Sequence, residues 1–291
     1  MGATKIISFA PAKINLYLHV IGHRDDGFHE LDSLVVFADV GDRVQVEPAE
    51  NTTFNVVGPF ASELERSEGN LVLQAVNALS THTEYAANVA LKLEKNLPIA
   101  SGIGGGSADA GATINALTEL WGVHLDKREL FDVAFGLGAD VPVCLFGKPA
   151  YMSGVGEILE PIQNLPSLPA ILVNPNVSLP TLSVFDRFVL GNSKSGHISC
   201  MPNDIEGLVS VLETRRNDLY DAAVDIAPEI GDVVSLLKAT SGCLLARMSG
   251  SGATCFGIYA SEVDARLAAS VIYDIQPNWW VAPTILQGNA E

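Results

Sequence analysis

Four glycines lie within five residues of one another, at positions 102, 104, 105 and 106. Glycine lacks a Cβ and adopts a positive φ readily, so the backbone N–H groups of such a run can close around phosphate oxygens. Apolar residues at positions 110, 114, 117 and 120 follow at helical spacing, and the free amides at a helix start also attract anions. Ser107 or Asp109 could cap this helix, and Gly122 could end it. We therefore predict a phosphate-binding loop, with a flexible turn as the alternative.

The loop does not match the common nucleotide motifs. Gly102-x-Gly104-x-x-Ser107 lacks the third glycine of a dinucleotide fingerprint, and no acidic residue ends a second strand about 20 residues further on. There is no Gly-Lys-Ser/Thr, and neither H-R-D nor D-F-G occurs in the chain. A nicotinamide enzyme, a Walker-type ATPase and a protein kinase are thus disfavoured.

Two isolated charges could serve phosphoryl transfer, which needs positioning, charge neutralisation and a proton acceptor. Asp140, in Leu-Gly-Ala-Asp-Val-Pro, has no charged neighbour and reads equally well as a cap or as a reactive carboxylate. Lys13 begins an alternating strand, where a lysine usually extends its ammonium group into water. The residue types alone leave both roles open.

The stretch Pro98–Ala108 resembles the phosphate-binding loop of the GHMP kinases, with its Pro-x-x-x-Gly-Leu-Gly-x-Gly-Ser-Ser pattern. Pro11–Leu16 and Met248–Phe256 lie where that family has its first and third motifs. Phe28 stands in place of a usual tyrosine, and Ala108-Asp109 in place of Ser-Asn. The resemblance implies a two-domain α+β fold with the active site in the interdomain cleft.

The resemblance also implies a role for particular residues. Asp140 would be the catalytic base and Lys13 its partner, with ATP as co-substrate and Mg²⁺ held largely by ATP and water rather than by a protein cage. A metal role for Asp109 stays open. ATP would contact Pro98, Ile99, Ala100, Ser101, Gly102, Ile103, Gly104, Gly105, Gly106, Ser107 and Ala108. A second substrate, a cytidine diphosphate polyol, would contact Asn15, Phe28, His29, Phe185, Gly250, Ser251 and Gly252.

Several of these predicted substrate contacts have an alternative interpretation as ordinary structural residues. His29 could be an ordinary loop histidine, and Phe185 could pack in the core instead of stacking on the base. Gly250-Ser251-Gly252 could brace the site or form a plain hairpin turn. The chain as a whole could instead be a homoserine- or mevalonate-type kinase of the family, or a non-catalytic nucleotide-binding protein.

The elements expected to position these residues are strands and helices in mixed order. Period-two and period-3.6 patterns predict strands over 14–21, 34–40, 43–47, 89–93, 142–146, 170–173, 246–249 and 254–259, and helices over 70–80, 127–137, 205–211, 222–227, 230–237 and 262–273. The strand over 14–21 should bury one face and place Lys13 with Asn15 on the more polar one. Five prolines between positions 161 and 180 suggest an ATP-binding domain over 1–160 and an α+β domain over 161–291.

Composition limits the partners. The 291 residues include 34 acidic and 17 basic side chains, and the net charge of −17 disfavours nucleic acid and anionic membranes. The four cysteines show no metal-binding spacing and sit in apolar settings, so we expect buried, reduced thiols in a cytoplasmic protein without a signal peptide. A monomer or homodimer acting on small molecules fits these constraints.

Overall fold

The computed structural model describes residues 5–25, 27–64 and 69–288. The chain divides into two compact units that interleave along the sequence. The first contains Met1–Ala12, Gly41–Ile99 and Gly104–Gly147, and the second contains Lys13–Val40, Ala100–Ile103 and Lys148–Glu291. The expected ranges 1–160 and 161–291 differ from these units because two long strands, β1 (Ile6–His23) and β2 (His29–Pro48), contribute to both.

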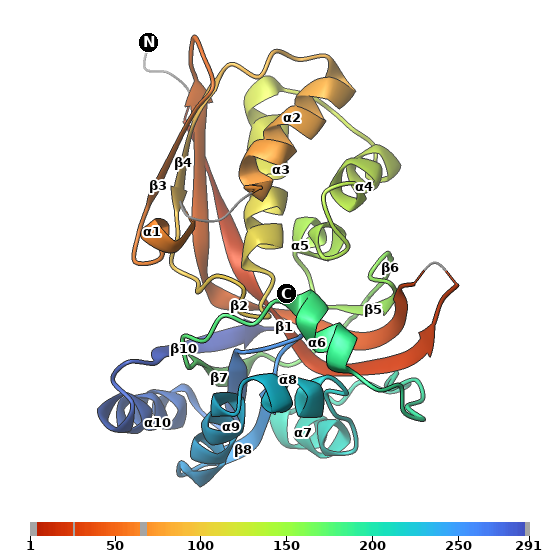
Figure 1. Ribbon diagram of the computed structural model, residues 1–291, viewed down its shortest axis with the longest axis vertical. Helices are drawn as coiled ribbons and strands as arrows, with labels where there is room; N and C mark the ends of the chain where they lie inside the picture. The colour runs from red at the N-terminus through yellow and green to blue at the C-terminus, as the bar shows by residue number, and fades with distance from the viewer. Residues whose placement is uncertain (1–4, 26, 65–68, 289–291) are drawn as a thin grey trace. The chain divides into compact units, whose positions relative to one another are not determined.

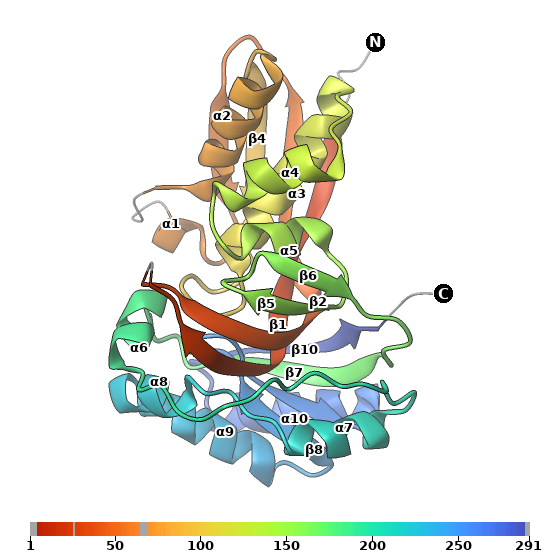
Figure 2. The ribbon, with the colours of Figure 1, turned by 90° about the vertical axis from the view of Figure 1, so that its right-hand side faces the viewer.

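The first unit is a sheet with helices on it (Figures 1 and 2). Its part of β2 pairs antiparallel with β4 (Val89–Glu94), which pairs in parallel with β3 (Thr53–Val57). Apolar residues at positions 75, 110, 114, 133, 134 and 141 join four of its helices into one core. These helices are α2 (Leu71–Thr83), α3 (Gly105–Trp121), α4 (Lys127–Phe135) and α5 (Val141–Phe146). The short helix α1 (Ala61–Leu64) has no buried residue.

The second unit is also a layered α+β structure. Its strands run in the order β2-β10-β7-β9-β8, and β5 pairs with both β2 and β6. The bounds are β5 (Ala150–Gly154), β6 (Ile158–Pro161), β7 (Leu168–Asn174), β8 (Cys243–Met248), β9 (Cys255–Tyr259) and β10 (Trp280–Gln287). The helices are α6 (Thr181–Arg187), α7 (Ile205–Glu213), α8 (Tyr220–Ile226), α9 (Glu229–Ala239) and α10 (Glu262–Ile275). Apolar side chains of α8, α9 and α10 share one core with β7, β8 and β9.

Most predicted elements are confirmed, and their ends follow local capping chemistry. Asn70 caps α2 by accepting a hydrogen bond from the Val72 amide, and Asp126 forms a capping box with Glu129 at the start of α4. Gly122 ends α3 in the left-handed conformation, as expected. The helices predicted beyond position 200 and the two strands flanking the Gly-Ser-Gly turn also form.

Several expectations about strands were wrong. Residues 142–146 form the helix α5, because a short apolar run fits a buried helix as well as a strand. The segments 34–40 and 43–47 belong to one continuous strand, β2. β1 is buried on both faces from Ala12 to Val20, so its alternation marks no polar face. Strands β3, β5, β6 and β10 had no counterpart in the prediction.

The cysteines match the expectation only in part. All four thiols are free, but only Cys144 and Cys255 are buried, while Cys200 is exposed. Cys200 lies in an irregular stretch between α6 and α7, where its apolar neighbours do not enclose it. Within the described ranges, no helix is long and apolar enough to span a bilayer.

Candidate active site

The glycine-rich loop joins β4 to α3 and contains three left-handed residues. Ala100, Gly102 and Gly104 have φ values of 50°, 73° and 65°. Gly104 occupies the N-cap position of α3 without a side-chain cap, so the first amides of a 17-residue helix follow directly on the loop. The expectation that Ser107 or Asp109 caps this helix was wrong, since both lie inside it. The local geometry matches what an anion site requires.

The Gly-Ser-Gly turn between β8 and β9 packs directly on the loop segment Ala100–Ile103. A Cβ on Gly102 would lie 2.4 Å from the carbonyl oxygen of Gly252, and one on Gly250 would lie 2.4 Å from the carbonyl oxygen of Gly102. Thr254 also donates its amide to the Ser101 carbonyl at 3.1 Å. The turn is therefore a brace for the loop and not a plain hairpin end.

Lys13 and Asn15 lie in β1 beside the same segment. The amide of Lys13 donates to the carbonyl of Ile103 at 2.9 Å, and the lysine is only 3% exposed. A lysine that extended its ammonium group into water would be exposed, so the alternative role for Lys13 was wrong. A buried ammonium group needs charged or hydrogen-bonding company.

Asn15 is fully buried, and only one of the two polar atoms of its side-chain amide forms a hydrogen bond within the described part of the chain. Its Nδ2 donates to the Ser33 hydroxyl at 2.7 Å, and its backbone amide donates to the Ser249 hydroxyl at 3.1 Å. Among the described residues, its Oδ1 accepts no hydrogen bond. This oxygen lies 3.5 Å from where a Cβ on Gly250 would be, next to the bracing turn.

Asp140 stands at the start of α5 and not before a strand. It occupies the N-cap position with φ −86° and ψ −12°, but its side chain accepts no capping hydrogen bond. The residue is half-buried. Its alternative role as a helix cap is therefore not supported by the geometry of α5.

Asp109 is the aspartate for which a metal role stayed open, and the structure gives it a different partner. It is 2% exposed and bonds the Lys95 ammonium group at 2.7 Å, while Asp42 bonds the same group at 2.5 Å. Burial raises the pKa of Asp109 to about 7, an effect that Lys95 opposes and Asp42 reinforces. Sequence reasoning missed Lys95, because nothing in Glu94-Lys95-Asn96 signals that it turns inward.

His29 lies in an aromatic cluster of the second unit. Its ring stacks on Phe185 with centroids 4.9 Å apart, and Phe188 and His23 meet it edge-on at 5.8 and 5.0 Å. Burial, and then the neighbouring His23, lowers the pKa of His29, which favours the neutral imidazole. Phe28 is 57% exposed. Phe185 thus packs against the histidine, and Phe188 is an aromatic neighbour that the sequence did not indicate.

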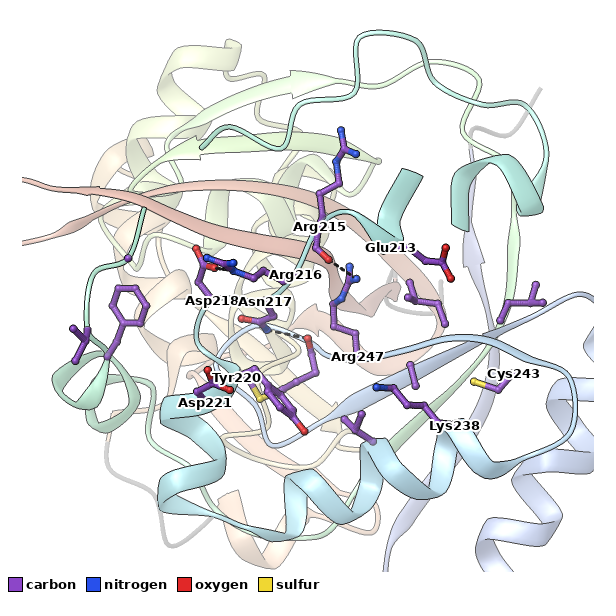
Figure 3. Close-up of a pocket in the computed structure, with 18 residues that line it drawn as sticks. Glu213, Arg215, Arg216, Asn217, Asp218, Tyr220, Asp221, Lys238, Cys243 and Arg247 are labelled. Atoms are coloured by element: carbon purple, nitrogen blue, oxygen red, sulfur yellow. Dashed lines mark hydrogen bonds and ion pairs between the residues drawn. The ribbon is translucent and has the colours of Figure 1, made fainter. Parts of the chain in front are cut away.

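A cavity of about 810 Å³ in the second unit is lined by other residues (Figure 3). Strand β8, α8 and α9 contribute to its lining, together with the segment Glu213–Asp218. Arg247 holds the carbonyls of Leu16, Leu212 and Arg215 there, and burial lowers its pKa to about 10. No predicted site residue lines this cavity.

Within each unit the structure brings predicted residues together. In the second unit Lys13, Asn15, the loop segment Ala100–Ile103 and the Gly-Ser-Gly turn are neighbours. The start of α3 and Asp140 belong to the first unit. Lys13 and Asp140 lie in different units, so their pairing stays a prediction. No three His, Cys, Asp or Glu side chains of the described ranges form a potential metal cluster.

Comparison with known proteins assigns this arrangement to a class. The family model of the GHMP kinases N terminal domain matches residues 70–148, and that of the GHMP kinases C terminal domain matches residues 208–275. The chain belongs to the GHMP kinase family, whose members use ATP as co-substrate. The fold class and the phosphate-loop resemblance are thereby confirmed.

Within this family the chain is similar, over nearly its full length, to 4-diphosphocytidyl-2-C-methyl-D-erythritol kinases. The enzyme of Paramagnetospirillum magneticum is 50% identical over 277 residues, covering 95% of this chain and 97% of its own. The enzyme of Brucella melitensis is 47% identical over 287 residues, covering 96% of this chain and 94% of its own.

Solved structures support the same family assignment. A crystal structure of 4-(cytidine 5'-diphospho)-2C-methyl-D-erythritol kinase superposes with a TM-score of 0.76 at 32% identity, covering 97% of this chain and all of the other. Homoserine kinase from Cytophaga hutchinsonii superposes with a TM-score of 0.73 at 18% identity, covering 98% of this chain and 96% of its own. The latter likeness shows the fold alone.

Proposed function

We propose that this chain transfers the γ-phosphoryl group of ATP to the 2-hydroxyl of 4-diphosphocytidyl-2-C-methyl-D-erythritol, a step of the non-mevalonate isoprenoid pathway. The observation that carries the proposal is about 50% identity, over nearly the whole chain, to enzymes bearing that name. The residues that the reaction requires are present, since this chain has the loop, Lys13, Asp140 and His29. The four free cysteines suit a cytoplasmic enzyme. It acts as a monomer or homodimer.

The loop Pro98–Ala108 binds the ATP phosphates through its backbone. The left-handed residues turn the chain so that amides can converge on the phosphates, and the start of α3 adds the positive end of a helix dipole. These uncharged donors explain how a protein with a net charge of −17 holds a polyanion.

Asp140 accepts the proton of the acceptor hydroxyl as its oxygen attacks the γ-phosphorus and the bond from that phosphorus to the β–γ bridging oxygen breaks, so that ADP leaves. Lys13 stabilises the aspartate carboxylate and offsets charge on the transferring group. The burial of Lys13 supports this role, because an ammonium group in a low-dielectric setting interacts strongly with a nearby anion. Asn15 offers its Oδ1 to a substrate hydroxyl.

The cytidine end of the acceptor binds at the aromatic cluster. His29, as a neutral imidazole, can donate to and accept from the base edge, while Phe185 fixes the ring plane from behind. Phe28, which is 57% exposed, stacks on the base. Gly250, Ser251 and Gly252 hold the phosphate loop and bring this turn close to the acceptor diphosphate, while the Gly252 amide itself donates to the Ser249 carbonyl at 3.0 Å.

Mg²⁺ fits a site that offers few protein ligands. When bound, it would offset the charge of the ATP phosphates. Ser107, in the first turn of α3, would supply one hydroxyl oxygen, while Asp109 is occupied by Lys95. A magnesium ion that keeps most of its waters matches this donor set.

Cytidine recognition can be tested by binding alone. We expect CDP to bind the wild-type protein in a calorimetric titration, and His29→Ala to weaken that binding by roughly tenfold or more, since base contacts of this kind contribute about 1 to 3 kcal/mol. Tyr85→Ala is a matched control, because it removes one ring of the stacked Tyr85–Trp121 pair in the other unit. Equal affinities of wild type and His29→Ala for CDP would remove His29 from the base site, and absence of CDP binding by the wild type would contradict the proposed acceptor.

A further inference from the structure

Three charged side chains form a buried cluster in the first unit. Lys95 follows β4, Asp42 lies on β2 and Asp109 lies in α3, and their side chains are between 0% and 3% exposed. The Lys95 Nζ bonds Asp42 at 2.5 Å and Asp109 at 2.7 Å. One ammonium group is thus shared between two carboxylates in the interior.

The cluster lies directly behind the start of α3. A Cβ on Gly105, the first residue of that helix, would be 3.2 Å from the Lys95 Nζ and 3.8 Å from Leu97 side-chain atoms. Gly105 therefore leaves room for the ammonium group, which touches the first turn of the helix from inside the unit.

The two carboxylates are not equivalent. Asp42 is saturated, because its Oδ1 accepts from the amides of Asn96 and Leu97 at 2.6 and 2.9 Å while its Oδ2 binds Lys95. Asp109 bonds only through Oδ2, and its buried Oδ1 has no hydrogen-bond partner among the described residues. Asp42 fixes the position of the Lys95 ammonium group, and Asp109 links that group to α3.

Stability does not explain the position of this ammonium group. A buried ion pair is often no better than apolar residues of similar volume, and a cation is unfavourable near the positive N-terminal end of a helix dipole. The two carboxylates cancel the ammonium charge, so the cluster offers an anion no net positive charge. What it supplies is a fixed contact behind Gly105, which holds the first amides of α3 where an anion would bind.

We propose that Lys95 is a positioning residue for ATP, held by Asp42 and Asp109 so that its ammonium group supports Gly105 and the first amides of α3 behind the phosphates. It touches neither the acceptor nor the reacting atoms. This inference rests on the proposed role of the loop in ATP binding. It predicts that losing this ion-paired support raises KM for ATP while kcat and KM for the acceptor change little.

The test uses a triple variant, because Lys95→Met alone leaves two buried carboxylates and could fail to fold. In Lys95→Met/Asp42→Asn/Asp109→Asn the cluster is neutral, and the amide oxygen of asparagine at position 42 can still accept from Asn96 and Leu97. We expect KM for ATP to rise about tenfold in steady-state assays, with kcat within about threefold of wild type. Lys92→Met, which removes an exposed lysine from β4, is the control and should change neither constant.

Two results would overturn the inference. One is a folded triple variant whose KM for ATP stays within about twofold of wild type. The other is an equal change in kcat and in both KM values, which indicates general distortion. Gly102→Ala separates this inference from the loop's own role: if it raises KM for ATP and the triple variant does not, only the positioning role of Lys95 fails. If neither raises it, the proposed phosphate loop fails as well.

Discussion

Replacing Asp140 with asparagine should lower kcat by about 100- to 10,000-fold, the range that a positioned general base contributes. The amide cannot accept the proton that leaves the attacking hydroxyl, whereas it keeps the size of the carboxylate. KM for ATP should change little, because the loop and α3 bind the nucleotide. A coupled ADP-release assay measures the loss of turnover, and calorimetry with an unreactive ATP analogue measures the retained binding.

The choice of asparagine also separates a catalytic role from a structural one. Asparagine caps helices as well as aspartate does, so a residue that only capped α5 would tolerate the change in both stability and activity. Asp132→Asn, on α4, controls for loss of a negative charge from the same unit. Turnover of Asp140→Asn within about threefold of the wild type would rule out the aspartate as base.

Gly102→Ala should reduce kcat/KM for ATP by about 100-fold. Gly102 has a φ of 73°, and an added Cβ would lie 2.4 Å from the Gly252 carbonyl oxygen and 2.6 Å from its amide nitrogen. Backbone on both sides must then separate, and the loop loses its brace. Since a misplacement of about 1 Å in a binding group can cost about 100-fold in rate, the loss should be large even though the substitution adds one methyl group.

Gly122→Ala is the matched control for this prediction. Gly122 has a φ of 64°, yet a Cβ there would meet nothing within 4 Å. It should cost about 1 to 2 kcal/mol of stability from backbone strain alone and leave kinetics unchanged. Melting temperatures measure the stability of both variants, and steady-state assays measure their kcat/KM for ATP. If Gly102→Ala and Gly122→Ala have the same kcat/KM for ATP, the packing of the loop on the Gly-Ser-Gly turn does not matter for catalysis.

The glycine-rich loop and the helix after it were predictable because their signals are local. The run of glycines, the apolar spacing of α3 and the ending at Gly122 all follow one another closely along the chain. The same holds for α2 and α4, whose caps precede clear helical periodicity. Such elements carry their own start and stop chemistry.

The strands were harder because their burial depends on distant chain segments. β1 is enclosed on both faces, and part of its cover comes from residues 234 positions away, as in the bond from the Asn15 amide to Ser249. An alternating pattern cannot reveal that second layer. Likewise α5 reads as a strand until its packing against α3 is known, where a Cβ on Gly111 would lie 2.9 Å from the Leu145 amide nitrogen.

In the candidate site, too, contacts between distant chain segments could not be predicted from the sequence. The family resemblance predicts roles for Lys13, Asp140, His29 and the loop, but it does not give the partners that three-dimensional packing provides. Lys95 meets Asp42 across 53 residues, and Phe185 reaches His29 from a helix in the second half of the chain. These contacts link the motifs to the fold and could be found only from the structure.

The proposed reaction is tested most directly by a coupled ADP-release assay with three acceptors offered separately to the wild-type protein with ATP and Mg²⁺. We expect turnover with 4-diphosphocytidyl-2-C-methyl-D-erythritol and none with homoserine or mevalonate. Turnover with homoserine or mevalonate, and none with the cytidine diphosphate polyol, would contradict the proposed acceptor while leaving the family intact. ATP binding without turnover of any acceptor would contradict catalysis itself.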